Sequence, residues 1–271
     1  MYTIDFEYDK RRLSEYNMII CSFNGNSGIE PVSSGADITF NQGKSSGSNK
    51  FNLYSSTYEN AYTATFQICK DPCKFDDDDK FYFSVNEVSA IQKWLCRNSY
   101  HKFKIDQDDY RNIYWNAVFS SKQILLNGRI VGLELTMYTD ATYAYRDEIC
   151  HVFHCTGENK SFDILDFNWK EGYIYPNIEI TVLQPGNFIL SFNGKESEIK
   201  NCQVKDKNEI ITIDGDNQII SSSNAEHNIA KDFNFIFPRL ENTYENNKNT
   251  FSVNLDCKII IKYSPIVLIG L

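Results

Sequence analysis

The sequence predicts a mainly β protein with one α-helix, and three observations support this fold class. Strand-like patterns recur along most of the 271 residues, separated by Gly, Pro and Asn turn signals. Aromatic residues make up 14% of the chain, with 17 Tyr and 19 Phe, and such residues favour strands. One segment, residues 84–98, instead has apolar residues at helical spacing.

The predicted helix begins after Ser84. Glu87 follows three residues later, which is the spacing of a capping box, where hydroxyl and carboxylate each bind a free backbone N–H. Asn98 is a plausible left-handed stop. The apolar face between these ends consists of Val88, Ile91, Trp94 and Leu95.

Four strands are expected directly after this helix. The first two are His101–Ile105 and Ile113–Ser120. Asn127-Gly128 then joins Lys122–Leu126 to Ile130–Tyr138, and Asn-Gly suits the positive φ angles of a two-residue hairpin turn. A helix beside four strands predicts a sheet with one helix packed against it.

Before the helix, alternating patterns predict further strands around a Gly-, Ser- and Asn-rich segment at residues 24–48. We expect the last two of these strands to pair across a Ser-Thr-Tyr-Glu-Asn turn. The expected strands are Tyr2–Tyr8, Tyr16–Phe23, Ile38–Phe40, Phe51–Ser55 and Tyr62–Cys69.

The pattern weakens between Tyr145 and Ser161, which indicates a linker or a strand that crosses between domains. We therefore expect a first domain at residues 1–152 and a second at residues 153–271. Closely spaced strands predict a sandwich or jelly roll in the second: Phe162–Trp169, Ile178–Leu183, Asn187–Phe192, Glu196–Lys205, Glu209–Asp214, Gln218–Ser221, Phe233–Phe237 and Thr250–Tyr263.

Charge and hydropathy exclude several classes of partner. The net charge is −9, and the residues before Cys155 include 16 basic and 20 acidic side chains, so a basic footprint for nucleic acid is absent. Membrane insertion is not expected, because no run approaches the ~20 apolar residues of a spanning helix. The apolar end, Pro265–Leu271, is better explained as a buried strand.

The candidate metal ligands are Cys150, His151, His154 and Cys155. On a strand, 151 and 155 share one face while 150 and 154 share the other, so a tetrahedral zinc site is not expected. The eight cysteines form no CxxC pair and are expected to be mostly buried thiols.

No catalytic or cofactor-binding set is predicted either. Familiar nucleophile and phosphate-binding motifs are absent from the sequence. The carboxylates Asp106, Asp108 and Asp109 could serve glycoside cleavage, but as part of a turn between strands they are more simply turn formers. The acidic run Asp76–Lys80 is read as a solvated loop rather than a calcium site.

The order of elements resembles the distal tail protein family of siphovirus-like bacteriophages. The features that carry the resemblance are a Trp-Leu helix, a Lys-Phe-Lys-Ile-Asp strand, an aromatic strand, a Gly-x-x-x-Gly-Leu-Glu-Leu-Thr strand and a Tyr-Ala-Tyr exit. In this chain they are Trp94-Leu95, Lys102–Asp106, Tyr114-Trp115, Gly128–Thr136 and Tyr143–Tyr145.

The resemblance implies a fold and an assembly. The first domain would be a barrel- or sandwich-like, ring-forming domain, and the second a galectin-like β-sandwich. Six copies would form a ring at the tail tip of the virion, assembled in the host cytoplasm and without enzymatic activity. The ring would join the tail tube to the hub or tail-associated lysin, carry receptor-binding proteins, and let DNA pass without specific binding.

In the resembled family a long hairpin of the first domain embraces the neighbouring subunit. The expected counterpart here is the Phe51–Cys69 strand pair, with Phe51, Tyr54 and Tyr62 as interface residues.

The alternative function is a carbohydrate-binding or adhesion module. A galectin-type sugar site is not implied, because Phe237-Pro238-Arg239 lacks the preceding His and Asn of the family motif. Trp169-Lys170-Glu171 likewise lacks its Gly.

Overall fold

The computed structural model describes residues 5–23, 35–58, 60–74, 81–169, 171–204, 208–243 and 245–270. The chain divides into two compact units, Met1–Arg146 with Val267–Leu271, and Asp147–Ile266. The boundary expected after residue 152 falls inside strand β11 (Ile149–Cys155). The last five residues group with the first unit, where Val267 is buried and the Tyr110 hydroxyl donates to the carbonyl of Gly270.

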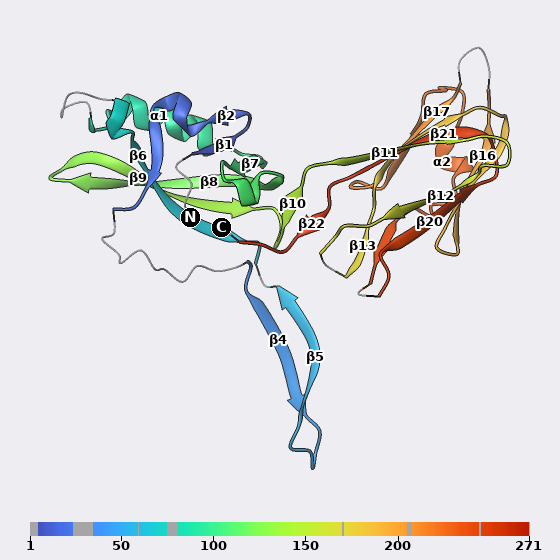
Figure 1. Ribbon diagram of the computed structural model, residues 1–271, viewed down its shortest axis with the longest axis horizontal. Coiled ribbons are helices and arrows are strands. Elements are labelled where there is room, and N and C mark those ends of the chain that lie inside the picture. Colours follow the sequence, from blue (N-terminus) through green and yellow to red (C-terminus); the bar gives the residue numbers. More distant parts are fainter. Residues whose placement is uncertain are drawn as a thin grey trace. The chain divides into compact units, whose positions relative to one another are not determined.

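The first unit is built on an antiparallel sheet with the strand order β2-β1-β7-β8-β9-β6-β3 (Figure 1). A short strand, β10, pairs with β8 and with β22 (Ile266–Val267). The other strands are β1 (Phe6–Tyr8), β2 (Arg11–Arg12), β3 (Met18–Cys21), β6 (Thr63–Lys70), β7 (His101–Ile105), β8 (Ile113–Leu126), β9 (Arg129–Thr139) and β10 (Ala144–Arg146).

The hairpin predicted at Asn127-Gly128 is confirmed. Both residues have positive φ, 49° and 79°, and Leu126 pairs with Arg129 across the turn. The strands predicted at Ile113–Ser120 and Lys122–Leu126 form one strand, β8, because pairing with β9 continues through residues 121 and 122.

Helix α1 (Val85–Leu95) is also confirmed, together with its capping box. The Ser84 backbone N–H donates to Glu87 Oε2 at 2.7 Å, and the Glu87 N–H donates to Ser84 Oγ at 3.3 Å. The helix ends at Leu95 rather than near Asn98, because the backbone of Cys96 leaves the helical region, with φ −86° and ψ 77°.

The buried face of α1 packs on aromatic side chains from the sheet and from the 3-10 turn Leu13–Tyr16. Trp94 is 3% exposed, its ring stacks on Phe6 and Tyr16, and its Nε1 donates to the Tyr8 carbonyl at 3.1 Å. Phe6 also contacts the rings of Phe66, Phe103 and Phe119. A helix with one apolar stripe thus buries that stripe against one face of the sheet.

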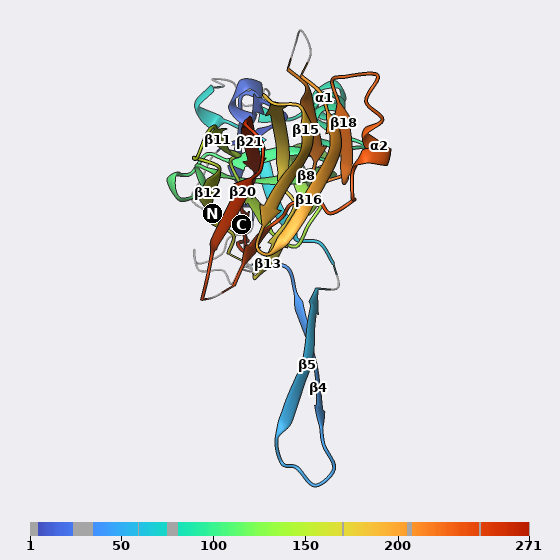
Figure 2. The same cartoon turned by 90° about the vertical axis from the view of Figure 1, so that its right-hand side faces the viewer.

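A separate two-stranded ribbon in this unit corrects one predicted pairing. Strand β5 (Phe51–Tyr58) pairs with β4 (Ile38–Lys44) (Figures 1 and 2). Strand β6 instead joins the main sheet between β3 and β9. The two strands differ in burial: Phe66 and Ile68 of β6 belong to the core, whereas Phe51, Leu53 and Tyr54 of β5 are exposed.

The second unit is an antiparallel sandwich, as predicted. A five-stranded sheet, β11-β21-β14-β17-β18, and a four-stranded sheet, β12-β20-β15-β16, contribute to one core. The strands beyond β11 are β12 (Ser161–Leu165), β14 (Asn177–Val182), β15 (Gly186–Phe192), β16 (Lys195–Cys202), β17 (Ile210–Asp214), β18 (Ile219–Ser222), β20 (Lys248–Val253) and β21 (Cys257–Tyr263).

Three details of this unit differ from the predictions. Residues 233–237 form no strand, because Phe235 has a φ of 58°, and they follow a one-turn helix, α2 (Ile229–Asp232). The long strand expected at 250–263 is broken into β20 and β21 by a bend. A short pair, β13 (Gly172–Ile174) with β19 (Leu240–Asn242), was not predicted.

Candidate assembly surface

The β4–β5 ribbon is the most exposed regular structure in the described chain. Its strands pair with each other from Ile38↔Tyr58 to Lys44↔Phe51 and with no other described strand. Nearly every residue of both strands is exposed or half-exposed. An isolated two-stranded ribbon is marginally stable in water. Among the described residues, neither of its outer edges pairs with a further strand, and a strand edge of this kind is a place where another chain can add.

One face of this ribbon is apolar. Side chains alternate along a strand, so the even-numbered residues 38–44 of β4, which include Ile38 and Phe40, point to the same face of the ribbon. Leu53 and Phe51 of β5 pair directly with residues 42 and 44, so they point to that face as well. These four apolar side chains are 44–64% exposed. We call the face with these four side chains, Ile38, Phe40, Phe51 and Leu53, the apolar face. The same register also places Gln42, Lys44, Ser56 and Tyr58 on it, and Lys44 Nζ lies 4.7 Å from the centre of the Phe51 ring.

The opposite face is polar and carries one aromatic ring. Asn41 donates to Ser55 Oγ across the strands at 2.9 Å. The Tyr54 ring lies against Gly43, where an added Cβ would come within 2.6 Å of the ring. A β-bulge between Asn41 and Gln42 leaves Tyr54 as the extra residue of β5.

Of the three predicted interface residues, the structure keeps two on this ribbon. Phe51 is 64% exposed on the apolar face, and Tyr54 is 66% exposed on the polar face. The third, Tyr62, does not lie on the ribbon. Its side chain is 2% exposed in the core of the first unit, and its backbone forms hydrogen bonds with Thr139 and Ala141. A buried core residue cannot serve as a contact surface.

Sequence reasoning missed Ile38, Phe40 and Leu53. The signal was present in two short alternations, Ile-Thr-Phe at 38–40 and Phe-Asn-Leu at 51–53. These two stretches are separated by a Gly- and Ser-rich segment, of which residues 45–50 form the hairpin loop.

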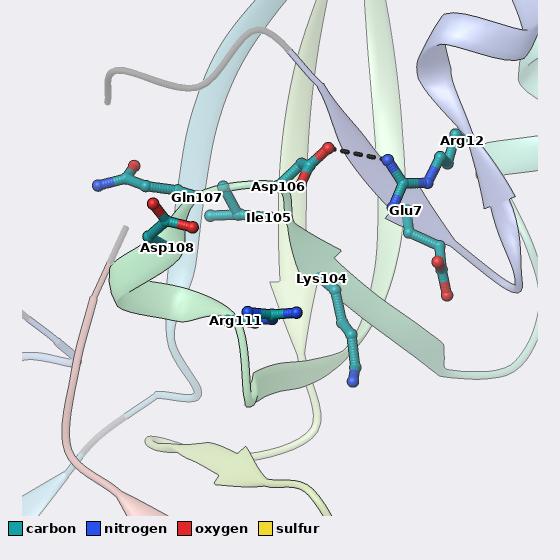
Figure 3. Close-up of a pocket in the computed structure, with 8 residues that line it drawn as sticks. All are labelled: Glu7, Arg12, Lys104, Ile105, Asp106, Gln107, Asp108 and Arg111. Atoms are coloured by element: carbon teal, nitrogen blue, oxygen red, sulfur yellow. Dashed lines mark hydrogen bonds and ion pairs between the residues drawn. The ribbon is translucent and has the colours of Figure 1, made fainter.

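A second polar surface lies at the β2 edge of the main sheet, in a hollow of about 390 Å³ (Figure 3). Glu7 pairs in register with Arg12 on one side and Lys104 on the other. Arg12 Nη1 also binds Asp106 Oδ2 at 2.8 Å. Charges of both signs thus alternate across three neighbouring strands, as opposite-charge cross-strand pairs do.

The carboxylates considered for glycoside cleavage are part of this hollow and its neighbourhood. Asp106 is ion-paired with Arg12, and Asp108 and Asp109 begin an exposed 3-10 turn, Asp108–Tyr110. The turn-forming role is the simpler explanation of their positions. The acidic run Asp76–Lys80 lies outside the described residues.

The Cys150–Cys155 segment is a regular strand, β11, with the predicted alternation of faces. The His151 ring stacks between Phe153 and Tyr263, and burial lowers its pKa. The described residues include no group of three or more His, Cys, Asp or Glu side chains placed to hold a metal.

The expectation of mostly buried thiols holds for only half of them. Cys69, Cys155, Cys202 and Cys257 are buried and Cys21 is half-buried, whereas Cys73, Cys96 and Cys150 are exposed. Among the described residues, no helix is long and apolar enough to cross a membrane.

Comparison with protein families decides the identity. Residues 1–141 match the model of a phage tail protein N-terminal domain, and residues 143–263 match that of a phage tail C-terminal domain. The chain belongs to this phage tail protein family. Its role is that of a structural component of a phage tail.

The fold of this phage tail protein is similar to that of a known tail component. The crystal structure of SPP1 Dit (gp 19.1), described as a paradigm of the hub adsorption apparatus in phages that infect Gram-positive bacteria, matches with a TM-score of 0.66. The match covers 96% of this chain and 98% of that chain at 9% sequence identity. No curated protein matches the sequence.

Proposed function

We propose that this phage tail protein is a distal tail protein whose six copies form a ring at the tail tip. The observation that carries the proposal is the β4–β5 ribbon, which has four exposed apolar side chains on one face and pairs with no other strand of the described residues. A ring requires a heterologous interface whose rotation closes, so each subunit needs a surface that reaches its neighbour. The ribbon fits that role.

The partners follow from this position in the tail. One side of the ring would bind the tail tube, and the other the hub or tail-associated lysin, with receptor-binding proteins attached further out. The fold similarity to a protein of a hub adsorption apparatus supports this arrangement. The role is structural rather than enzymatic, and the protein is assembled in the host cytoplasm and carried in the virion.

DNA would pass through the ring without specific binding. Net charge supports this part, because the residues before Cys155 include 20 acidic and 16 basic side chains. A wall without excess positive charge does not retain phosphate.

The proposal is tested on the full chain with tail tube and hub proteins present. We expect light scattering and negative-stain microscopy to show closed rings of the wild-type protein. The double variant Phe40→Asp/Leu53→Asp places two charges on the apolar face and is expected to stay folded but not to form rings. Its matched control, Asn41→Asp/Thr57→Asp, places two charges on the same strands but on the polar face, and is expected to form rings.

Two results would overturn the proposal. One is a wild-type protein that stays monomeric with both partners present. The other is ring formation by the apolar-face variant at the wild-type level, because the ribbon would then not be the contact.

A further inference from the structure

Two connections of the second unit lie side by side at one end of the sandwich. The first joins β12 to β13, and its described residues are 166–169 and 171. The second joins β19 to β20, and its described residues are 243 and 245–247. Because β12 pairs with β20 and β13 pairs with β19, the two connections must run next to each other. Between them lies a hollow of about 440 Å³.

The first connection, Asp-Phe-Asn-Trp, is held by buried polar side chains. Asp166 is 1% exposed and Asn168 is 9% exposed, and the Asn168 side chain donates to the Asp166 carboxylate. The Ile266 N–H donates to Asn168 Oδ1 at 2.6 Å, and the Trp169 N–H donates to the Ile266 carbonyl at 3.1 Å. These bonds fix the backbone of the connection.

The fixed backbone presents two aromatic rings to solvent. Phe167 and Trp169 flank the buried Asn168, and they are 52% and 64% exposed. An exposed apolar patch with a polar rim is a feature of ligand-binding surfaces, and Trp combines an apolar ring with a polar N–H. Both residues belong to the lining of the hollow.

The rest of the hollow offers hydrogen-bond acceptors. Asn242 Nδ2 donates to the Asn168 carbonyl at 2.6 Å and Asn247 Nδ2 donates to the Asp166 carbonyl at 3.2 Å, which orients both amides. Within the part of the chain that the structure describes, neither amide's Oδ1 accepts a hydrogen bond. Glu171 and Glu245 add exposed carboxylates to the lining.

We propose that this hollow is a saccharide-binding site for a neutral sugar. The C–H face of a pyranose ring would stack on the Trp169 indole, and its hydroxyl groups would donate to the amide oxygens of Asn242 and Asn247. The carboxylates of Glu171 and Glu245 in the described lining disfavour an anionic ligand.

The size and polarity of the site favour a sugar over a protein partner. A stable protein interface buries about 800 Å² on each partner around an apolar centre. This hollow is small and mostly polar, with aromatic rings beside oriented amides. The site is separate from the galectin-type strand motif that the sequence lacks, and it does not depend on ring assembly.

The test uses the full-length protein and a glycan array of neutral mono- and oligosaccharides, followed by titration of the bound sugars by saturation-transfer NMR. We expect binding to at least one sugar, weakened about tenfold or more by Trp169→Ala and restored in part by Trp169→Phe. The control Phe235→Ala removes a ring that is also 64% exposed in the same unit, and should leave the dissociation constant within about twofold. An interaction worth tenfold corresponds to about 1.4 kcal/mol.

Three outcomes would overturn the site. The first is that the protein binds no sugar of the array. The second is that Trp169→Ala binds sugar as tightly as the wild type does. The third is that Trp169→Ala no longer binds a tail-protein partner while its sugar binding is unchanged. The last would identify the aromatic rings as a protein contact. None of them bears on whether rings form, so this inference and the proposed function fail separately.

Discussion

Glu87 stabilises the first unit in two ways, and its removal is therefore expected to cost more than the loss of the Ser84 cap. Its carboxylate accepts from the Ser84 N–H and hydroxyl, and it also binds Lys70 Nζ at 2.6 Å. The Lys70 side chain is only 8% exposed, while that of Glu87 is 46% exposed. Without Glu87, a nearly buried ammonium loses its carboxylate partner.

The magnitudes follow from these contacts. Ser84→Ala removes a cap and should cost ~1 kcal/mol of unfolding free energy. Breaking a fully buried ion pair costs about 3–5 kcal/mol. The exposure of Glu87 and the Phe83 ring 5.4 Å from Lys70 Nζ reduce that cost. We therefore expect about 2–3 kcal/mol for Glu87→Ala.

Urea unfolding followed by tryptophan fluorescence measures these costs. A Trp169→Phe background removes the one tryptophan of the second unit, so Trp94 and Trp115 report on the first. In the double variant Lys70→Met/Glu87→Ala no ammonium is left behind, so its cost should be smaller than the sum of the single costs. Equal costs for Ser84→Ala and Glu87→Ala, or an additive double variant, would refute the reasoning.

The same contacts predict a pH dependence. Burial alone would raise the pKa of Glu87, but the hydrogen bonds from Lys70 and Ser84 outweigh it and hold the pKa below its usual value of 4.5. The unfolded chain therefore binds this proton at higher pH than the folded one. The stabilisation is present above pH 4.5 and is lost as the pH falls through the lower, folded pKa. In Glu87→Gln this part of the acid destabilisation should be absent.

Two further predictions concern the core and the thiols. Trp94→Ala should lower the free energy of unfolding by ~3–5 kcal/mol. Trp94→Phe should lower it less, because Phe keeps most of the packing while the hydrogen bond to the Tyr8 carbonyl is lost. Equal melting temperatures for Trp94→Ala and wild type would contradict this. All eight thiols should react with a thiol reagent after unfolding without reductant, as counted by mass spectrometry, and a disulfide in freshly prepared protein would contradict it. In the folded protein, the exposed Cys73, Cys96 and Cys150 should react first. The buried Cys155, Cys202 and Cys257 should react last, because burial raises the pKa of each of these thiols.

Local signals were enough to predict several elements of this protein. The helix start depends on Ser84 and Glu87, which lie three residues apart, and the β8–β9 turn depends on Asn127 and Gly128 alone. Such features are decided by backbone conformations and hydrogen bonds between near neighbours, so the sequence carries them directly. The alternation of faces along β11 follows from the strand period in the same way.

Strand partners and burial were decided only by the tertiary structure. The sequence shows that residues 51–58 and 63–70 are strand-like, but not that the first pairs with β4 and the second with β3 and β9. Pairing depends on which apolar faces a distant core can accept, and the core accepts Phe66 and Ile68. The same competition buried Tyr62 and left Phe40 and Leu53 exposed. Strand pairing in the second unit likewise brought the β12–β13 connection beside the β19–β20 connection. Contacts between segments far apart in the chain decide these positions, and no local pattern encodes them.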